Sequence, residues 1–251
     1  MSGHSKWKTI AHKKGAADAK RGKIFSKFSK ELMMLAKQGG GNADMNAALR
    51  TAIQKARASN MPMDNIERAI KKGTGELEGA TLEEVTYEGF AQGGVALVVK
   101  ALTDNKNRAA AEIRHIFAKH GSSFASVGSV SRGFKRKGQI FVEAAAVDED
   151  KLMGIVLDAG AEDMTKDGDQ FEVLTDPASF DPVVTALDKA EIKKSSAEVT
   201  LVPENYVPLT DKAVAKAVLK FVEELEDNDD VQNVYTNLDL DDAMLNELGK
   251  E

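Results

Sequence analysis

Lysine side chains are the most concentrated chemical groups in this sequence, and they gather in its first 37 residues. This segment holds ten Lys or Arg residues against two acids, although the whole chain has a formal net charge of −6. Ammonium groups at that density attract polyanions and neutralise phosphates. We therefore expect the segment to contact a polyanionic partner.

Between residues 16 and 38 the lysines have helical spacing. When the segment is wound at about 100° per residue, its apolar residues fall in one arc, namely Ile24, Phe25, Phe28, Leu32 and Leu35. The opposite arc holds five lysines, namely Lys20, Lys23, Lys27, Lys30 and Lys37. A helix of this kind packs on a core and presents charge to an anionic partner. The alternative is a solvated lysine face on an ordinary helix.

The segment in front of this helix, residues 1–14, has a composition typical of a nucleic-acid-binding arm. It carries four lysines, two histidines and the only tryptophan of the chain, Trp7, and it has too few apolar residues to form a core. Lysines of such an arm bind phosphates, and an indole ring stacks on a base.

A second candidate site lies at a predicted helix start, Thr103 to Arg108. Free backbone N–H groups at a helix N-terminus, together with Lys106 and Arg108, would form a phosphate site. The alternative is a plain cap by Asp104.

A third candidate site is a basic stretch, Arg132 to Lys137, in which one aromatic residue lies among four cations. We predict a cationic hairpin that turns at Lys137-Gly138. The alternative is an edge strand that its charges protect from pairing.

Groups for catalysis are scarce. The chain has no cysteine, which excludes disulfides, thiolate catalysis and cysteine-based zinc sites. No nucleotide-binding, zinc-protease or serine-hydrolase motif occurs. His115 and His120 are five residues apart and do not share a helix face, while the C-terminal carboxylates form runs without a histidine partner. We predict a protein that is not an enzyme and has no cofactor and no metal.

The longest strictly apolar run, Val95 to Val99, is far too short to span a membrane. The N-terminus has no apolar segment of the kind that a secretory signal requires. We expect a cytoplasmic protein without membrane contact.

Charge is segregated along the chain. Residues 1–80 have 16 basic and 7 acidic residues, and residues 81–138 have 9 and 5. The balance then reverses, with 5 basic and 16 acidic residues in 139–204 and 4 and 12 in 205–251. A cationic first half and an anionic second half point to a nucleic-acid partner in spite of the acidic total.

Apolar periodicity predicts an N-terminal three-helix domain. Helices are expected over residues 16–38, 46–59 and 64–72, separated by a glycine run and by Asn60-Met61-Pro62. With the arm in front, this domain covers residues 1–80.

The pattern of residues 81–251 predicts an α+β architecture with an inserted domain. Strands over residues 139–144, 162–166, 170–175 and 197–202, with helices over 148–159 and 179–190, give the ferredoxin-like order βαββαβ. Residues 82–136 supply three strands and one helix, an incomplete unit, and residues 211–236 supply a helix and a strand that can complete it. We therefore predict a discontinuous α/β sandwich domain, residues 81–138 plus 205–251, and an inserted, acidic ferredoxin-like domain, residues 139–204.

Several motifs resemble those of the YebC/PmpR family. They are Gly3-His4-Ser5-Lys6-Trp7, Asp18-Ala19-Lys20-Arg21-Gly22-Lys23, Asn60-Met61-Pro62, Tyr87-Glu88-Gly89-Phe90 and Leu102-Thr103-Asp104-Asn105. The resemblance covers essentially the whole chain and implies a three-domain protein. It also implies one of two roles, a DNA-binding transcriptional regulator or a ribosome-associated factor that relieves stalling at proline-rich stretches.

The function expected from residues and resemblance together is a nucleic-acid-binding regulator of gene expression. The family label favours DNA, whereas a lysine-rich arm with one tryptophan suits ribosomal or transfer RNA, and the ribosome, better. A protein-interaction scaffold that acts through the acidic half is a further alternative, and the oligomeric state stays open. The residues predicted to bind nucleic acid are His4, Lys6, Trp7, Lys8, Lys13, Lys14, Lys20, Arg21, Lys23, Lys27, Lys30, Lys106, Arg108, Arg132, Lys135 and Arg136.

Overall fold

The helical domain consists of three helices around a small apolar core. The computed structural model describes residues 18–249, and it begins with α2 (Asp18–Gly39), α3 (Ala47–Ala58) and α4 (Met63–Thr74). Each helix contributes one buried residue to the centre of this core, namely Leu32, Leu49 and Ile66. This packing confirms four residues of the apolar stripe that predicted the first helix, Phe25, Phe28, Leu32 and Leu35, whereas Ile24 is exposed and lies outside the core.

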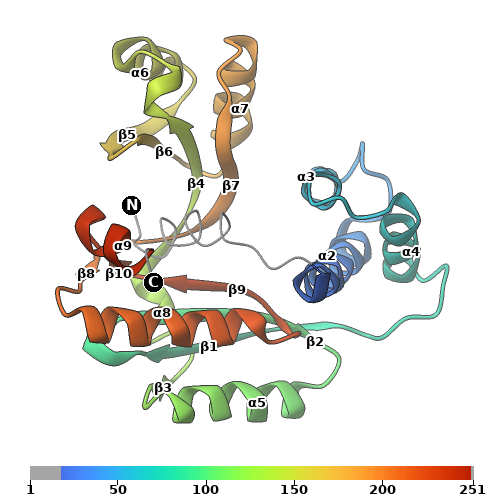
Figure 1. Ribbon diagram of the computed structural model, residues 1–251. Coiled ribbons are helices and arrows are strands. Elements are labelled where there is room, and N and C mark those ends of the chain that lie inside the picture. The colour runs from blue at the N-terminus through green and yellow to red at the C-terminus, as the bar shows by residue number, and fades with distance from the viewer. Residues whose placement is uncertain (1–17, 250–251) are drawn as a thin grey trace.

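The middle domain is built on a four-stranded antiparallel sheet in the order β3-β1-β2-β9. Its strands are β1 (Glu83–Phe90), β2 (Ala96–Thr103), β3 (Ser123–Ala125) and β9 (Val231–Thr236). Two helices, α5 (Lys106–Lys119) and α8 (Lys212–Asp227), pack against one face, and their Phe117 and Phe221 rings meet in its core. Because β9 pairs with β2, the chain returns to this sheet after the insertion, which confirms the discontinuous domain (Figure 1).

The inserted domain has the predicted ferredoxin-like fold. Its elements are β4 (Phe134–Glu143), α6 (Glu149–Asp158), β5 (Ala161–Asp167), β6 (Gln170–Thr175), α7 (Phe180–Lys189) and β7 (Lys194–Pro203). The sheet order is β5-β6-β4-β7. Both helices pack on one face through Leu152, Val156, Val183 and Leu187.

The predicted hairpin at Lys137-Gly138 is wrong, because β4 runs through these residues as one continuous strand. Lys137 and Gly138 pair with Thr200 and Val199 of β7. A Cβ atom on Gly138 would lie 2.2 Å from Thr175 Oγ1 and 2.6 Å from the Phe180 ring. The glycine therefore lets α7 approach the sheet closely, and it does not form a turn.

One of the three strands predicted within residues 82–136 was expected over residues 127–136, and this position is wrong. The third strand of the middle sheet, β3, lies earlier in the chain, and a short 3-10 helix, η2 (Ser131–Gly133), precedes β4. Serine and glycine, abundant between residues 121 and 133, favour such turns over a strand.

The base of the insertion covers the second face of the middle sheet. Val130 and Phe134, just before and at the start of β4, pack with Leu201 of β7 against Ala96 and Val98 of β2. The two strands that carry the inserted domain are thus anchored in an apolar cluster of the middle domain.

The C-terminal residues form elements that the sequence did not predict. A two-stranded parallel ladder joins β8 (Val207–Pro208) to β10 (Leu238–Asp239), and α9 (Asp242–Leu248) buries Leu245 and Leu248 in the middle core. Asp241 caps α9 by accepting the N–H of Met244 at 2.7 Å. Part of the carboxylate run at 239–242 therefore has a structural role.

Candidate nucleic-acid interface

Six of the predicted contact residues lie outside the described part of the chain, namely His4, Lys6, Trp7, Lys8, Lys13 and Lys14. Lys20 and Arg21 lie near the start of α2, where the structure describes the backbone only. The remaining eight predicted residues belong to three segments of the chain, and the first two meet where Lys30 and Arg108 both contact Asp230.

Lys23, Lys27 and Lys30 of α2, which we call the lysine row, point at the carboxyl end of α8. Lys23 Nζ donates to the carbonyl oxygen of Asp227 at 3.0 Å, and Lys27 Nζ donates to that of Glu226. Lys30 Nζ donates to the carbonyl oxygen of Asp229 at 2.9 Å. The last carbonyl groups of a helix have no partner inside it and carry partial negative charge, so this row caps α8 from another domain.

Asp230, just after α8, gathers donors from both domains. Its side chain is only 4% exposed and lies 2.6 Å from Lys30 Nζ and 3.0 Å from Arg108 Nη2. Thr103 Oγ1 donates to it at 2.9 Å. Burial alone would raise the pKa of Asp230, but hydrogen bonds from Lys30, Arg108 and Thr103 outweigh burial and hold the pKa below its ordinary value. The carboxylate is therefore a charged connection between α2 and the middle domain.

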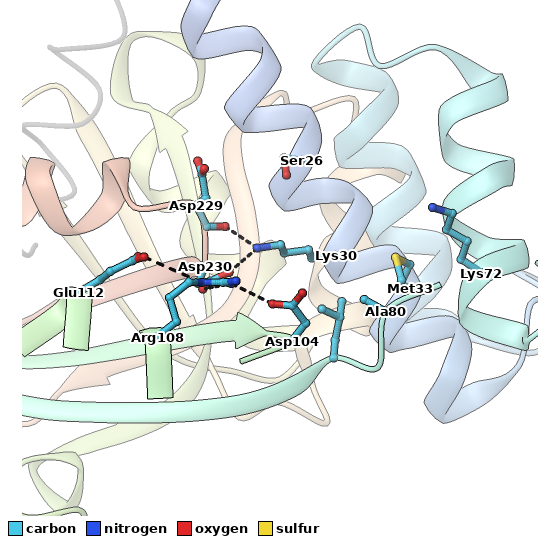
Figure 2. A pocket seen from close by; sticks show the side chains of 11 residues that line it. Ser26, Lys30, Met33, Lys72, Ala80, Asp104, Arg108, Glu112, Asp229 and Asp230 are labelled. Atoms are coloured by element: carbon cyan, nitrogen blue, oxygen red, sulfur yellow. Dashed lines mark hydrogen bonds and ion pairs between the residues drawn. The ribbon is translucent and has the colours of Figure 1, made fainter. Parts of the chain in front are cut away.

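A cavity of about 460 Å³ lies beside Asp230, between the helical and middle domains (Figure 2). Lys30 and Lys72 reach it from the helical domain, and Arg108 reaches it from α5. Asp104, Glu112, Asp229 and Asp230 bring four carboxyl groups to the same cavity. Positive and negative groups are thus mixed here, and the cavity by itself is no phosphate site.

The predicted site at the start of α5 is already paired. Asn105, not Asp104, caps the helix, because its side chain accepts the N–H of Arg108 at 3.0 Å. Lys106 lies 2.5 Å from a carboxyl oxygen of Glu83, and Arg108 Nη2 lies 2.8 Å from Asp104. Both cations contact protein carboxylates in this conformation.

The basic stretch before and within β4 contributes two open cations. Lys135 Nζ lies 2.5 Å from Glu204, whereas Arg132 and Arg136 are exposed and form no ion pair with any residue that the structure describes. An anionic partner could therefore contact Arg132 and Arg136 without breaking an ion pair.

Further open cations lie on the helical domain, outside the predicted set. They are exposed and have no ion pair within residues 18–249, and they are Lys37, Arg57, Arg68, Lys71 and Lys72. In the middle domain, by contrast, Lys100, Lys106 and Lys119 each contact a carboxylate. The charge excess of residues 1–80 was the available signal for this group, but helical spacing did not single these residues out.

Within the described residues, no helix is long and apolar enough to cross a membrane, and no cluster of three or more potential metal ligands occurs.

The fold and these cations define a three-domain α+β protein with a cationic helical domain. The family described as "TACO1/YebC protein N-terminal domain" matches residues 5–76, and "TACO1/YebC second and third domain" matches residues 82–238. The chain belongs to the YebC family, as its motifs predicted.

Relatives and a solved structure agree with this membership. A "Probable transcriptional regulatory protein" of Desulfatibacillum aliphaticivorans is 56% identical over 98% of this chain and 100% of its own length. One of Syntrophobacter fumaroxidans is 52% identical over 99% of this chain and 100% of its own length. The crystal structure of a conserved hypothetical protein from Aquifex aeolicus superposes with a TM-score of 0.79 at 44% identity, covering 90% of this chain and 93% of that chain.

Proposed function

We propose that this protein is a nucleic-acid-binding regulator of gene expression, and that its helical domain and N-terminal arm contact the nucleic acid. The observation that carries the proposal is the open cationic group on α2, α3 and α4, whereas Lys100, Lys106 and Lys119 of the middle domain each contact a carboxylate. Exposed, unpaired Lys and Arg side chains on one domain form the electrostatic footprint of a phosphate-binding surface.

Folded RNA is the target that we favour. In a duplex-reading helix, residues near the N-terminus contact base edges, and α4 has Asp64 and Glu67 at its beginning, both exposed. Carboxylates there oppose approach to a phosphate-lined groove. Cations without a base-reading set suit RNA of the translation apparatus, where shape and stacking dominate recognition.

Duplex DNA is the second candidate, and one observation favours it. Only residues 59–62 separate α3 from α4, and Asn60 there has a φ of 60°. A connection this short, with a left-handed residue, is typical of helix-turn-helix units, and Figure 1 shows α3 end-on where α4 is seen from the side. The names of the relatives point the same way.

A triple substitution tests the cationic surface. Arg57→Gln with Arg68→Gln and Lys71→Gln should weaken binding to a labelled 20-nucleotide RNA and reduce the slope of log K against log salt by about 2 to 3, since about one counterion is released per phosphate. Fluorescence anisotropy between 50 and 200 mM salt, values at which about 10³ or more in affinity is at stake for a many-phosphate contact, would measure both.

The matched control is Lys151→Gln with Lys189→Gln and Lys193→Gln. It removes the same charge from the inserted domain, where these lysines have no ion pair within the described chain. Equal losses in the two triple variants would contradict the proposed surface. Co-sedimentation with ribosomes, with and without nuclease, then separates an RNA target from a promoter.

A further inference from the structure

The junction between α2 and the carboxyl end of α8 covers the most regular row of cations in the described chain. Lys23, Lys27 and Lys30 lie on one face of α2, and all three donate to carbonyl oxygens of residues 226–229. Lys30 also contacts the carboxylate of Asp230, at 2.6 Å. Carbonyl dipoles are weaker partners for an ammonium group than phosphate oxygens, because hydrogen bonds between two ionised groups are about twice as strong.

The main hydrophobic clusters of the two domains are separate. The described hydrophobic cluster of the helical domain includes only residues 25–70, and that of the middle domain includes only residues 85–248. The helical domain also contacts the inserted domain through an ion pair, Lys55 to Glu198 at 2.9 Å, and both side chains are more than one-third exposed. Such contacts are screened by salt and compete with other ions.

The connection between the domains permits movement. Residues 74–81 are exposed throughout and include Gly75 and Gly79. The cavity beside Asp230 reaches Lys30 and admits solvent to the edge of the junction (Figure 2). Lys30 is therefore the lysine of the row that an incoming anion can reach while the contacts of Lys23 and Lys27 still hold.

We propose that the α2–α8 junction is releasable and that the lysine row is a covered phosphate-binding surface, which a nucleic-acid backbone occupies when the helical domain leaves α8. This inference rests on the proposed function, because nucleic acid is the occupant. The carboxyl end of α8 and Asp230 hold the row in the free protein. Binding exchanges these partners for phosphates. Because only open molecules bind, the apparent affinity is the affinity of the open form multiplied by the fraction of molecules that are open.

Two variants that break the same contact have opposite effects on affinity. Asp230→Asn removes the charge that retains Lys30 and leaves the row intact, so RNA binding should tighten by about fivefold through a larger open fraction. Lys23→Gln with Lys27→Gln and Lys30→Gln also opens the junction, but it removes the phosphate ligands, so binding should weaken by about tenfold at 0.1 M salt. Asp104→Asn is the control, since Asp104 lines the same cavity and contacts Arg108 but no lysine of α2.

Opening is measured by energy transfer between two dyes. Because the chain has no cysteine, Gln54→Cys on α3 and Ala111→Cys on α5, both exposed, can be labelled specifically in the full-length protein. Transfer should change as a 20-nucleotide RNA is added, with the same midpoint as binding followed by anisotropy. It should also change with NaCl alone, at lower salt in Asp230→Asn than in Asp104→Asn.

Saturating RNA without any change in energy transfer would overturn the inference while leaving the proposed function standing. So would tighter binding of Asp104→Asn equal to that of Asp230→Asn, because net charge alone would then explain both. If the protein opens with salt but binds neither RNA nor a 20-base-pair duplex, the proposed function and the phosphate occupant both fail, and only the releasable junction remains. If Asp230→Asn does not fold, the RNA titration of the doubly labelled protein without this substitution decides whether the junction opens.

Discussion

Glu88 of β1 is a single buried carboxylate that holds a loop in place. Its side chain accepts backbone N–H groups from Gly128 and Val130 at 2.7 Å and from Ser131 at 3.0 Å. Burial would raise the pKa of Glu88, but these N–H donors outweigh burial and lower the pKa. The ionised group thus fixes the residues that lead to Arg132 and to the start of β4.

Glu88→Gln should destabilise the protein by about 2–3 kcal/mol, because an amide NH₂ group would face a backbone donor and the charge on the acceptor would be lost. Equilibrium urea unfolding measures the change. Glu84→Gln on the same strand is the control. Its ion pair with Lys100 is solvent-exposed, so the loss should stay below about 1 kcal/mol. Similar losses for both would mean that the three N–H groups find other acceptors.

At the scale of elements, two glycines of the inserted domain have opposite roles. Gly138 lies in β4 where Thr175 and Phe180 leave no room for a Cβ atom. Gly154 lies inside α6, and nothing approaches its Cβ position within 4 Å. The same residue type is therefore required by packing in one element and is a conformational weakness in the other.

Gly138→Ala should lower the free energy of unfolding by about 2 kcal/mol or more, since Phe180 and Thr175 must move. Gly154→Ala should raise it by about 0.5–1 kcal/mol, because alanine restricts the unfolded chain and favours the helix. Thermal and urea unfolding of the two variants would show the difference in sign. A neutral Gly138→Ala would indicate that α7 can shift away from the sheet without cost.

At the scale of the whole molecule, the inserted domain stands on a stem of two paired strands. Gly138 and Val199 are partners in the ladder between β4 and β7. Below this pair, Phe134 and Leu201 pack with Val98 on the middle sheet. The parts of β4 and β7 that include Phe134 and Leu201 therefore pack with the middle domain. The parts that include Ile140 and Ala197 belong to the core of the inserted domain.

Replacement of residues 139–198 by Asn-Gly should leave a folded, cooperatively melting protein. The new turn joins two residues that already face each other across the ladder, and Asn-Gly forms the tight turn that such a hairpin needs. Circular dichroism and a thermal melt measure the outcome. Deletion of residues 131–203 is the contrast, because it removes Phe134 and Leu201 and uncovers Ala96 and Val98. If that chain also folds and stays soluble, the apolar cluster is not needed.

Local patterns in the sequence were sufficient for the helices, most strands and the ferredoxin-like order. The stripe of Phe28, Leu32 and Leu35 depends only on the helical period, and the alternation in residues 170–175 depends only on the strand period. The return of residues 231–236 to the first sheet was predicted because residues 82–136 alone form an incomplete unit. The helical and strand periods are local features, and the completion of the sheet follows from the number of strands and helices. The sequence contains both kinds of information.

Only the tertiary structure decided which segment of the chain packs against each helix face. The lysine row has the spacing that the sequence predicted, yet its partners at the end of α8 lie about 200 residues further along the chain, 204 for Lys23 and Asp227. Gly138 has the appearance of a turn residue until Phe180 is packed above it. Periodicity establishes which side chains share a face, whereas the partner of that face depends on contacts between distant segments, which form only when the whole chain has folded.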